Sequence, residues 1–275
     1  MPPPELDDLP EPHDLHNRLS ADRPLDWGDP LPSKAQIAAE FGAGAATRGL
    51  EFLTRALEVE KRVTADFTAA VPSGTVPHNL QNRMKSPHSL ARKLRKTENY
   101  WSPRDPEDVL RYTVVAPEPD DLVEAAAGIV RDLQSKGWVM DSAHHSYVDG
   151  SRYKGLHAFM HCQGELVELQ IHSQESLEVK TRTTPLYEVE RDPRQSPPAR
   201  AAARAACISM SVQMRQPIGI AELTELGGVP VSTRSYGGTH STALARPGAK
   251  TPSTAQVPAK PGHPAPGKPR DGIER

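Results

Sequence analysis

Apolar side chains recur every three to four residues through the first part of the chain, and this spacing predicts helices. Ile37 and Phe41 begin the pattern, and the stretch 50–67 continues it after an interruption at 42–49. The interruption is rich in glycine and predicts a break between two helices. The prolines within 72–77 are expected to end this helical region.

A serine followed by a proline predicts the start of another helix. Ser86 is a favoured N-cap residue and Pro87 a favoured first helical residue, and 88–96 contains no helix breaker. The β-branched and aromatic run 109–115 then predicts a strand. A helix is expected over 120–136, where apolar residues share one face.

Two strands separated by a short turn are predicted at 156–161 and 165–172. Successive side chains on a strand point to opposite faces, so Glu168 is expected on the more polar face of the second strand. Helices are expected over 176–184, ended by the next proline, and over 199–214. This order of elements predicts an α/β or α+β domain with a mixed β-sheet flanked by helices.

Proline is concentrated at both ends of the chain. More than half of its 28 prolines lie in residues 1–32 and 227–275. Low-complexity, proline-rich sequence without an apolar period is typical of disorder. We therefore expect a disordered lead at 1–32, a folded domain at 33–226 and a disordered tail at 227–275.

Charge and composition exclude several classes of protein. The formal net charge is −2, so the chain is not a polycation that coats nucleic acid or an anionic membrane. No apolar run is long enough to cross a bilayer, and the acidic, proline-rich N-terminus is unlike a secretory signal, so we expect a cytoplasmic protein without membrane contact. Cys162 and Cys207 are expected to be reduced thiols without a catalytic role. The histidines fit no established zinc spacing.

The densest cationic stretch surrounds the predicted helix start at Ser86. Arg83 and Lys85 precede it, and Ser89 and Lys93 lie four residues apart within it. A helix N-terminus, a hydroxyl and several cations together form a cradle for a polyphosphate. The alternative is a solvated basic helix face, with or without a nucleic-acid role.

Two carboxylates and one tyrosine extend this hypothesis. Asp108 precedes the predicted strand, and Glu168 lies within another; taken singly, each is an ordinary turn or surface residue. With the phosphate cradle, the two could hold Mg²⁺ against a triphosphate. Tyr153 lies between Arg152 and Lys154, so it could stack on a nucleobase while the cations meet phosphates, or simply pack at a strand start.

These motifs, in this order, resemble the synthetase domain of the RelA/SpoT family. The resemblance rests on R-x-K-x-x-x-S-x-x-x-K at 83–93, then Asp108, Y-x-G-L-H at 153–157 and V-E-L-Q-I at 167–171. It implies a GTP diphosphokinase-like transferase that moves the β,γ-pyrophosphate of ATP to the 3′-hydroxyl of GDP or GTP, forming the alarmone (p)ppGpp. It also implies a fold similar to that of polymerase β-type nucleotidyltransferases, as in stand-alone small alarmone synthetases.

The resemblance gives the first set of residues a role toward ATP. Arg83 would pack against the adenine or the phosphates, while Lys85, Ser89 and Lys93 would grip the polyphosphate. Asp108 would bind Mg²⁺. The donor is therefore expected to be ATP with magnesium as cofactor.

The second set would serve the acceptor. Tyr153 would stack on the acceptor base with His157 close to it, and Arg152 or Lys154 would supply positive charge. Glu168 would position or deprotonate the attacking 3′-hydroxyl and share the metal.

Three positions depart from the family pattern. The run Pro-Lys-x-Asn-Gly expected before the stacking tyrosine is replaced by 148–152, and the usual Arg-Thr after Gln-Ile is His172-Ser173. The arginine expected late in the Asp108 strand is Thr113, with an arginine displaced to Arg111. All three lie on the acceptor side or in the sheet, whereas the ATP motif is intact, so the donor is predicted more firmly than the acceptor.

Two alternatives remain open from the sequence. One is a toxic relative that pyrophosphorylates adenine nucleotides or the 3′ end of tRNA and is paired with an antitoxin. The other is a nucleotide- or RNA-binding module that has lost catalysis. Small relatives often form homo-oligomers, and the sequence leaves that possibility open as well.

Overall fold

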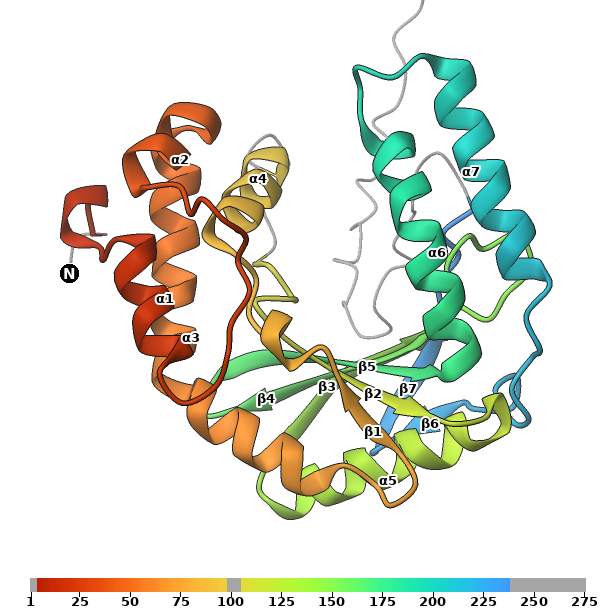
Figure 1. Ribbon diagram of the computed structural model, residues 1–275. Helices are drawn as coiled ribbons and strands as arrows, with labels where there is room; N and C mark the ends of the chain where they lie inside the picture. The colour runs from red at the N-terminus through yellow and green to blue at the C-terminus, as the bar shows by residue number, and fades with distance from the viewer. Residues whose placement is uncertain (1–3, 98–104, 238–275) are drawn as a thin grey trace, which may run out of the picture. The chain divides into compact units, whose positions relative to one another are not determined.

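A mixed β-sheet of seven strands organises the chain, with helices on both of its faces (Figure 1). The computed structural model describes residues 4–97 and 105–237. The helices are α1 (Pro12–Ser20), α2 (Lys34–Phe41), α3 (Ala43–Ala70), α4 (Pro87–Thr97), α5 (Leu122–Ser135), α6 (Gln174–Arg191) and α7 (Pro197–Val212). The strands are β1 (Val76–His78), β2 (Leu110–Ala116), β3 (Val139–His145), β4 (Leu156–Cys162), β5 (Glu165–Ser173), β6 (Glu225–Leu226) and β7 (Val229–Thr233). The predicted fold class is confirmed.

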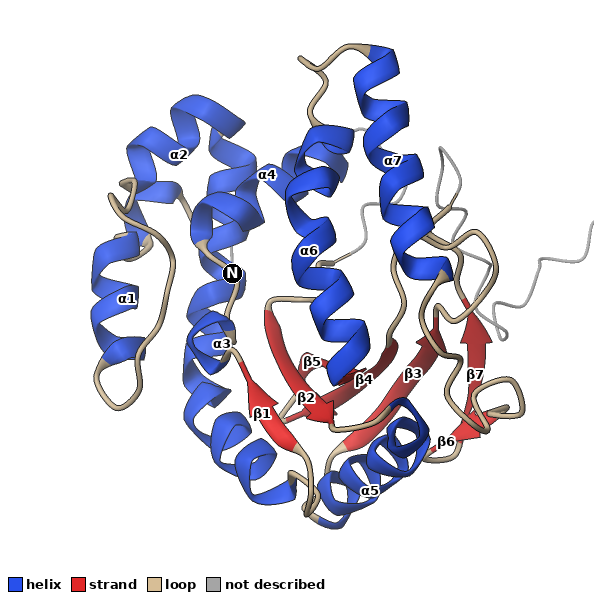
Figure 2. Ribbon diagram, turned by 45° about the vertical axis from the view of Figure 1, so that its right-hand side comes forward, coloured by secondary structure: helices blue, strands red, loops and turns tan. Residues whose placement is uncertain are grey.

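The strand order is β1-β2-β5-β4-β3-β7-β6 (Figure 2). Strand β2 runs parallel to β5, which places Arg111 beside Glu168. Strand β4 runs antiparallel to β5, which places His157 opposite Gln170. Paired residues of neighbouring strands project from the same face of a sheet, so these four polar side chains share one face.

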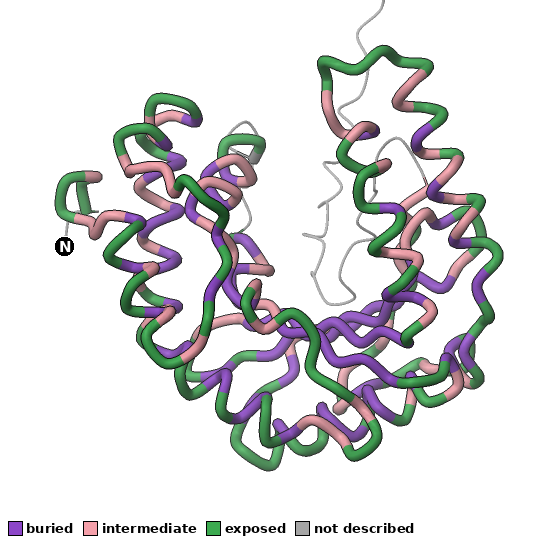
Figure 3. The backbone as a smooth tube through the Cα atoms, in the orientation of Figure 1, coloured by how far each residue is buried: buried purple, intermediate pink, exposed green. Residues whose placement is uncertain are grey.

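The two faces of the sheet differ in what covers them. The first is apolar and packs on α3 and α5; the Tyr112 ring, for example, lies 4.8 Å from that of Phe67 on α3. The second carries the polar side chains and packs on α6, where Lys180 donates a hydrogen bond to Gln170. Figure 3 shows the buried strands between more exposed helices. The apolar face supplies the core, and the polar face is left for chemistry.

The prediction of a disordered lead at 1–32 is wrong for residues 4–32. Pro12 is the first residue of helix α1 rather than a breaker, as proline is well tolerated there. Leu15 and Leu19 are 0% and 3% exposed in the main core, and the Trp27 indole donates a hydrogen bond of 3.0 Å to the carbonyl of Met84. Residues 1–3 lie outside the described part of the chain.

Leu15→Ala is therefore expected to destabilise the protein by about 2–5 kcal/mol, because it leaves a cavity in the core. Urea unfolding of the full chain measures this loss. The control is Ile218→Ala, at a position that is 71% exposed, where the change should stay within about 0.5 kcal/mol. Equal stabilities for the two variants would show that α1 does not belong to the core.

The predicted tail at 227–275 also begins too early. Strand β7 pairs with β3 in parallel, with Ala143 beside Val231, and the chain continues over the sheet edge to Gly237. Strand β3 was not predicted at all. The remainder of the expected tail, 238–275, lies outside the described residues.

Two helix boundaries differ from the sequence prediction. The break between α2 and α3 is Gly42 alone, whose φ of 92° suits glycine, and Gly49 lies inside α3. Helix α6 continues past Pro185 to Arg191. Contacts with α7 stabilise its second half, including an ion pair of 2.8 Å between Arg204 and Glu190.

Two expectations drawn from composition concern membranes and thiols. In the described part of the chain, no helix combines the length and the apolar character needed to cross a bilayer. Cys162 and Cys207 are both free and buried. Burial raises the pKa of each thiol, which keeps both protonated and poorly nucleophilic.

Candidate active site

A cavity of about 360 Å³ lies between the polar face of the sheet and helix α6. Strands β2, β4 and β5 form its floor, and α6 and α7 form a wall. Its lining includes Asp108, Arg111, Tyr153, His157, Gln170 and Lys180. The cavity thus brings together residues from Asp108 to Tyr236, which lie far apart in the sequence.

Asp108 and two lysines of the predicted phosphate cradle form one charged cluster at this cavity. Lys85 Nζ lies 2.7 Å from Asp108 Oδ2, and Lys93 Nζ lies 2.6 Å from Oδ1. The Lys85 amide also donates a hydrogen bond to the carbonyl of Val109, which fixes the start of α4 to the start of β2. Burial alone would raise the pKa of Asp108, but the two lysines outweigh it and lower that pKa to about 2. The Asp108 carboxylate is therefore ionised at neutral pH.

The helix start in front of this cluster has the predicted geometry. Helix α4 begins at Pro87, and the Ser89 amide donates a hydrogen bond of 3.3 Å to Ser86 Oγ. Ser89 is half-buried and lies one turn before Lys93. Lys85 just before α4 and Lys93 within it thus both contact Asp108, and Ser89 lies between them in the first turn of the helix.

Arg83 is not part of this cluster. Its side chain is 1% exposed and its Nε pairs with Glu60 of α3. Its Nη1 donates to the carbonyl of Pro24 and its Nη2 to that of Leu19, each at 2.8 Å. The guanidinium thus fastens the N-terminal segment to α3 and does not line the cavity. Arg83, expected to contact the adenine or the phosphates of ATP, thus lies apart from Lys85 and Lys93.

A chain of hydrogen bonds runs from Glu168 across the floor of the cavity. His157 Nδ1 lies 2.8 Å from Glu168 Oε1, which also accepts a bond of 3.2 Å from Gln170 Nε2. The Tyr153 hydroxyl lies 2.9 Å from His157 Nε2 and 2.9 Å from His172 Nε2. The chain holds the phenol of Tyr153 from two sides and so orients its ring.

The pKa shifts assign the protons in this chain. Burial would raise the pKa of Glu168, but the hydrogen bond and charge of His157 lower it, so the carboxylate is ionised and His157 Nδ1 donates to it. Burial raises the pKa of Tyr153 well above 10 and lowers that of His172 well below 6.5. The protonated hydroxyl of Tyr153 can donate to one of the two imidazole Nε2 atoms and accept from the other.

The two cations predicted beside Tyr153 are placed differently. Arg152 lines the cavity, but its Nε pairs with Glu190 at 3.2 Å and its guanidinium lies over the Tyr187 ring. Lys154 is buried and is not part of the cavity lining. Neither residue therefore presents a free positive charge to an acceptor.

Tyr236 is a cavity residue that sequence reasoning missed. Its ring stands nearly perpendicular to that of Tyr153 at 5.4 Å, and its hydroxyl lies 3.4 Å from His144 Nε2. Its backbone is held by Ser151 Oγ, which accepts from the Tyr236 amide at 3.2 Å, and by Arg152, which donates to the Tyr236 carbonyl. The residue was missed because 227–275 was expected to be a tail.

Lys180 on α6 was also missed, although the sequence carries a signal for it. Ser176, Lys180, Thr184 and Tyr187 recur at helical spacing, and the last three line the cavity. This polar stripe becomes visible once α6 is known to pass Pro185. Lys180 Nζ donates to Gln170 Oε1 at 2.9 Å.

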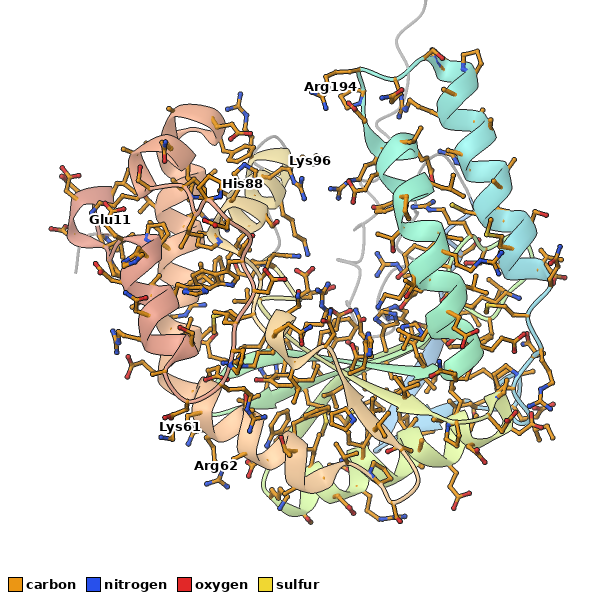
Figure 4. The ribbon with its side chains drawn as sticks, in the orientation of Figure 1. Glu11, Lys61, Arg62, His88, Lys96 and Arg194 are labelled. Carbon is orange, nitrogen blue, oxygen red and sulfur yellow. The ribbon has the colours of Figure 1, made fainter. Side chains whose placement is uncertain are left out.

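A second cavity, of about 430 Å³, lies between α4 and the far end of α6. Lys96 and Arg194, both labelled in Figure 4, line it. Most of its charge is compensated locally, since Arg194 pairs with Asp192 at 2.9 Å and Arg191 with Glu188 at 2.6 Å. Its carboxylates, Glu188 and Asp192, are the partners in these pairs, and its described lining contains no aromatic side chain.

Similarity to known proteins is found among solved structures. No family model matches the chain, and no curated protein matches it. Among solved structures, the small alarmone synthetase 1 from Bacillus subtilis, bound to its product pppGpp, is 16% identical; the match covers 58% of this chain and 88% of that chain with a TM-score of 0.36. The chain is similar to alarmone synthetases of known structure.

A GTP pyrophosphokinase family protein from Streptococcus pneumoniae gives a second match. It is also 16% identical, and the match covers 64% of this chain and 87% of that chain with a TM-score of 0.36.

Proposed function

We propose that the protein is a nucleotide pyrophosphokinase that transfers the β,γ-pyrophosphoryl group of ATP to the 3′-hydroxyl of GDP or GTP. One observation carries the proposal: Asp108, which pairs with Lys85 and Lys93, lines the same cavity as Tyr153 and His157, and His157 is hydrogen-bonded to Glu168. Cations for a polyphosphate, two ionised carboxylates and an oriented aromatic ring are what such a transfer requires.

The donor triphosphate would bind at the start of α4. Its oxygens would take the place of Asp108 on the ammonium groups of Lys85 and Lys93, since phosphate is a strong acceptor for such donors. Ser89 would add a hydroxyl hydrogen bond from the same helix. This exchange releases the Asp108 carboxylate toward the phosphates.

Magnesium fits the donor chemistry at Asp108. No three His, Cys, Asp or Glu side chains within 4–97 and 105–237 converge as a metal site, but Mg²⁺ often takes one carboxylate and completes its shell with phosphates and water. Asp108 already balances two positive charges and stays ionised. Glu168 Oε1 is occupied by His157 and Gln170, so Asp108 is the principal ligand. The ion would offset negative charge on the phosphates.

The acceptor nucleotide would lie toward Tyr153 and Tyr236. Tyr153 would contact the base, and the 3′-hydroxyl would approach Glu168. In the transfer, the 3′-oxygen forms a bond to the β-phosphorus and the bond from that phosphorus to the α-phosphate oxygen breaks, releasing AMP. The hydroxyl proton passes to the Glu168 carboxylate, and His157 keeps that carboxylate oriented.

An acceptor panel with ATP labelled at the β-phosphate tests this proposal. GDP, GTP, AMP, ADP and deacylated tRNA are offered separately with Mg²⁺, and products are separated by chromatography. The expected result is label on GDP or GTP together with release of AMP. Label on adenine nucleotides or tRNA alone would overturn the guanine assignment, and nucleotide binding with no labelled acceptor would leave a binding module.

Glu168→Gln is expected to reduce the transfer rate by at least about a hundredfold, because the amide cannot accept the hydroxyl proton. The thermal unfolding temperature should stay close to wild type, since the side chain can still accept from His157. The control is Glu165→Gln at the start of the same strand, where Glu165 pairs with Arg55 at 3.0 Å. Wild-type turnover in Glu168→Gln would remove this residue from the mechanism.

A further inference from the structure

Of the cations at or beside the cavity, two have no carboxylate partner. Lys85 and Lys93 share Asp108, and Arg152 pairs with Glu190. Arg111 and Lys180 form no ion pair with any residue of the described chain.

The two unpaired cations face the same space from different elements. Arg111 projects from β2 beside Glu168 of β5, and Lys180 reaches down from α6 to Gln170 Oε1. Both line the cavity of about 360 Å³. Gln170 Oε1 is also the acceptor of a long hydrogen bond of 3.5 Å from Thr113, so a neutral amide oxygen is the only hydrogen-bond partner of the Lys180 ammonium that the structure shows.

This arrangement leaves positive charge in excess at the cavity. Burial, with the nearby charge of Arg111, lowers the pKa of Lys180 to about 8, although Glu168 opposes the shift. Holding two like charges together in a half-buried site is unfavourable unless an anion joins them. A bound anion would therefore be stabilised by both residues.

We propose that Arg111 and Lys180 form a subsite that binds a phosphate or pyrophosphate group of a substrate; this deepens the proposed function and rests on it. The planar guanidinium of Arg111 can form two parallel hydrogen bonds to phosphate oxygens, and the ammonium of Lys180 adds a point charge. Gln170 holds that ammonium over the floor of the cavity.

Arg111 and Lys180 also supply the positive charge that Arg152 and Lys154, on either side of Tyr153, do not supply. Lys154 is not among the residues that line the cavity, and Arg152 forms an ion pair with Glu190. Arg111 and Lys180 supply the free charge instead, from β2 and α6. The phosphates involved can be those of the acceptor or those of ATP, and the experiment separates the two.

The first arm measures binding without catalysis. Inorganic pyrophosphate is titrated into the full-length protein by calorimetry, and Lys180→Met and Arg111→Met are each expected to weaken its affinity at least about tenfold, the loss of one charge-assisted hydrogen bond. Lys180→Arg should retain most of it. The control is Arg182→Met, an exposed position on α6 outside the cavity lining. Unchanged affinity in both Met variants, with wild-type unfolding temperatures, would overturn the subsite.

The second arm identifies the source of the phosphate. A rise of about tenfold in the KM for GDP or GTP alone, in Lys180→Met, assigns the subsite to the acceptor. The same rise for ATP alone assigns it to the donor, and no change in either KM contradicts a role in substrate binding. If the variants bind pyrophosphate more weakly but the wild-type protein transfers no pyrophosphate, the subsite is retained and the proposed function is refuted. If the wild-type protein is an active enzyme and the variants bind pyrophosphate as it does, the proposed function is retained and the subsite is refuted.

Discussion

Asp108→Asn is expected to lower kcat by at least about a hundredfold while ATP binds no more weakly than before. The carboxylate is the proposed magnesium ligand, and a neutral amide cannot offset the charge of the metal and the phosphates. At the same time, Lys85 and Lys93 lose the anion that occupies them at 2.7 and 2.6 Å. Both ammonium groups are then freer to bind phosphate, so the ATP affinity should hold or rise.

Single-turnover kinetics and equilibrium binding of a non-hydrolysable ATP analogue separate these two effects. The matched control is Asp105→Asn, three residues earlier, where Asp105 is largely exposed and pairs only loosely with Arg48 at 3.5 Å. Its kcat and its ATP affinity should both match wild type. A hundredfold loss of ATP affinity in Asp108→Asn, with kcat retained, would contradict the assignment of Asp108 to the metal.

Arg83→Met is expected to destabilise the protein by about 3–5 kcal/mol, because it removes the positively charged partner of the buried Glu60 carboxylate. The carbonyls of Leu19 and Pro24 lose their hydrogen bonds as well. Urea unfolding measures the loss. The control Arg18→Met removes an exposed pair with Glu58 at 3.7 Å and should cost no more than about 1 kcal/mol.

A double-mutant cycle keeps this prediction testable if Arg83→Met folds poorly. Adding Glu60→Gln removes the uncompensated charge, so the double variant should recover part of the lost stability. The KM for ATP of the folded double variant should equal that of wild type. A stable Arg83→Met protein with weakened ATP binding would return Arg83 to the donor site.

The central elements were predictable because local pattern and tertiary environment agree there. Strand β2 is β-branched, β5 alternates, and α4 carries its own start signal in Ser86 and Pro87. The polar position of Glu168 follows from alternation alone. In each case the residues that decide the structure lie within one element.

The ends of the chain were not predictable from local pattern. Leu15, Leu19 and Trp27 are scattered among prolines, and their burial depends on α3 and on the loop at Met84. Strand β3 was missed because polar residues such as His144 interrupt its pattern. The side chains of these polar residues lie on the polar face of the sheet. That face borders the cavity and not the hydrophobic core.

The residues of the candidate site likewise include some that the sequence predicted and some that it did not. Lys85, Lys93 and Asp108 could be grouped from sequence because they belong to the motifs that carry the family resemblance. In the structure, a backbone bridge between Met84 and Leu110 joins their two segments. Arg83 was misplaced because its partners come from α3 and the N-terminal segment. Lys180 was missed because the sequence of its helix does not show that the helix packs on the polar face of the sheet. Tyr236 was missed because a disordered tail was expected from residue 227.

The position of a single labelled phosphate in the product is the most direct test of the proposed pyrophosphate transfer. The protein is incubated with Mg²⁺, GDP and ATP labelled at the β-phosphate, and the product is cleaved to locate the label. We predict that the labelled phosphate is bonded directly to the 3′-oxygen of the guanine nucleotide, with one AMP released per transfer. Label retained in ADP, or released as free pyrophosphate with no nucleotide product, would contradict it.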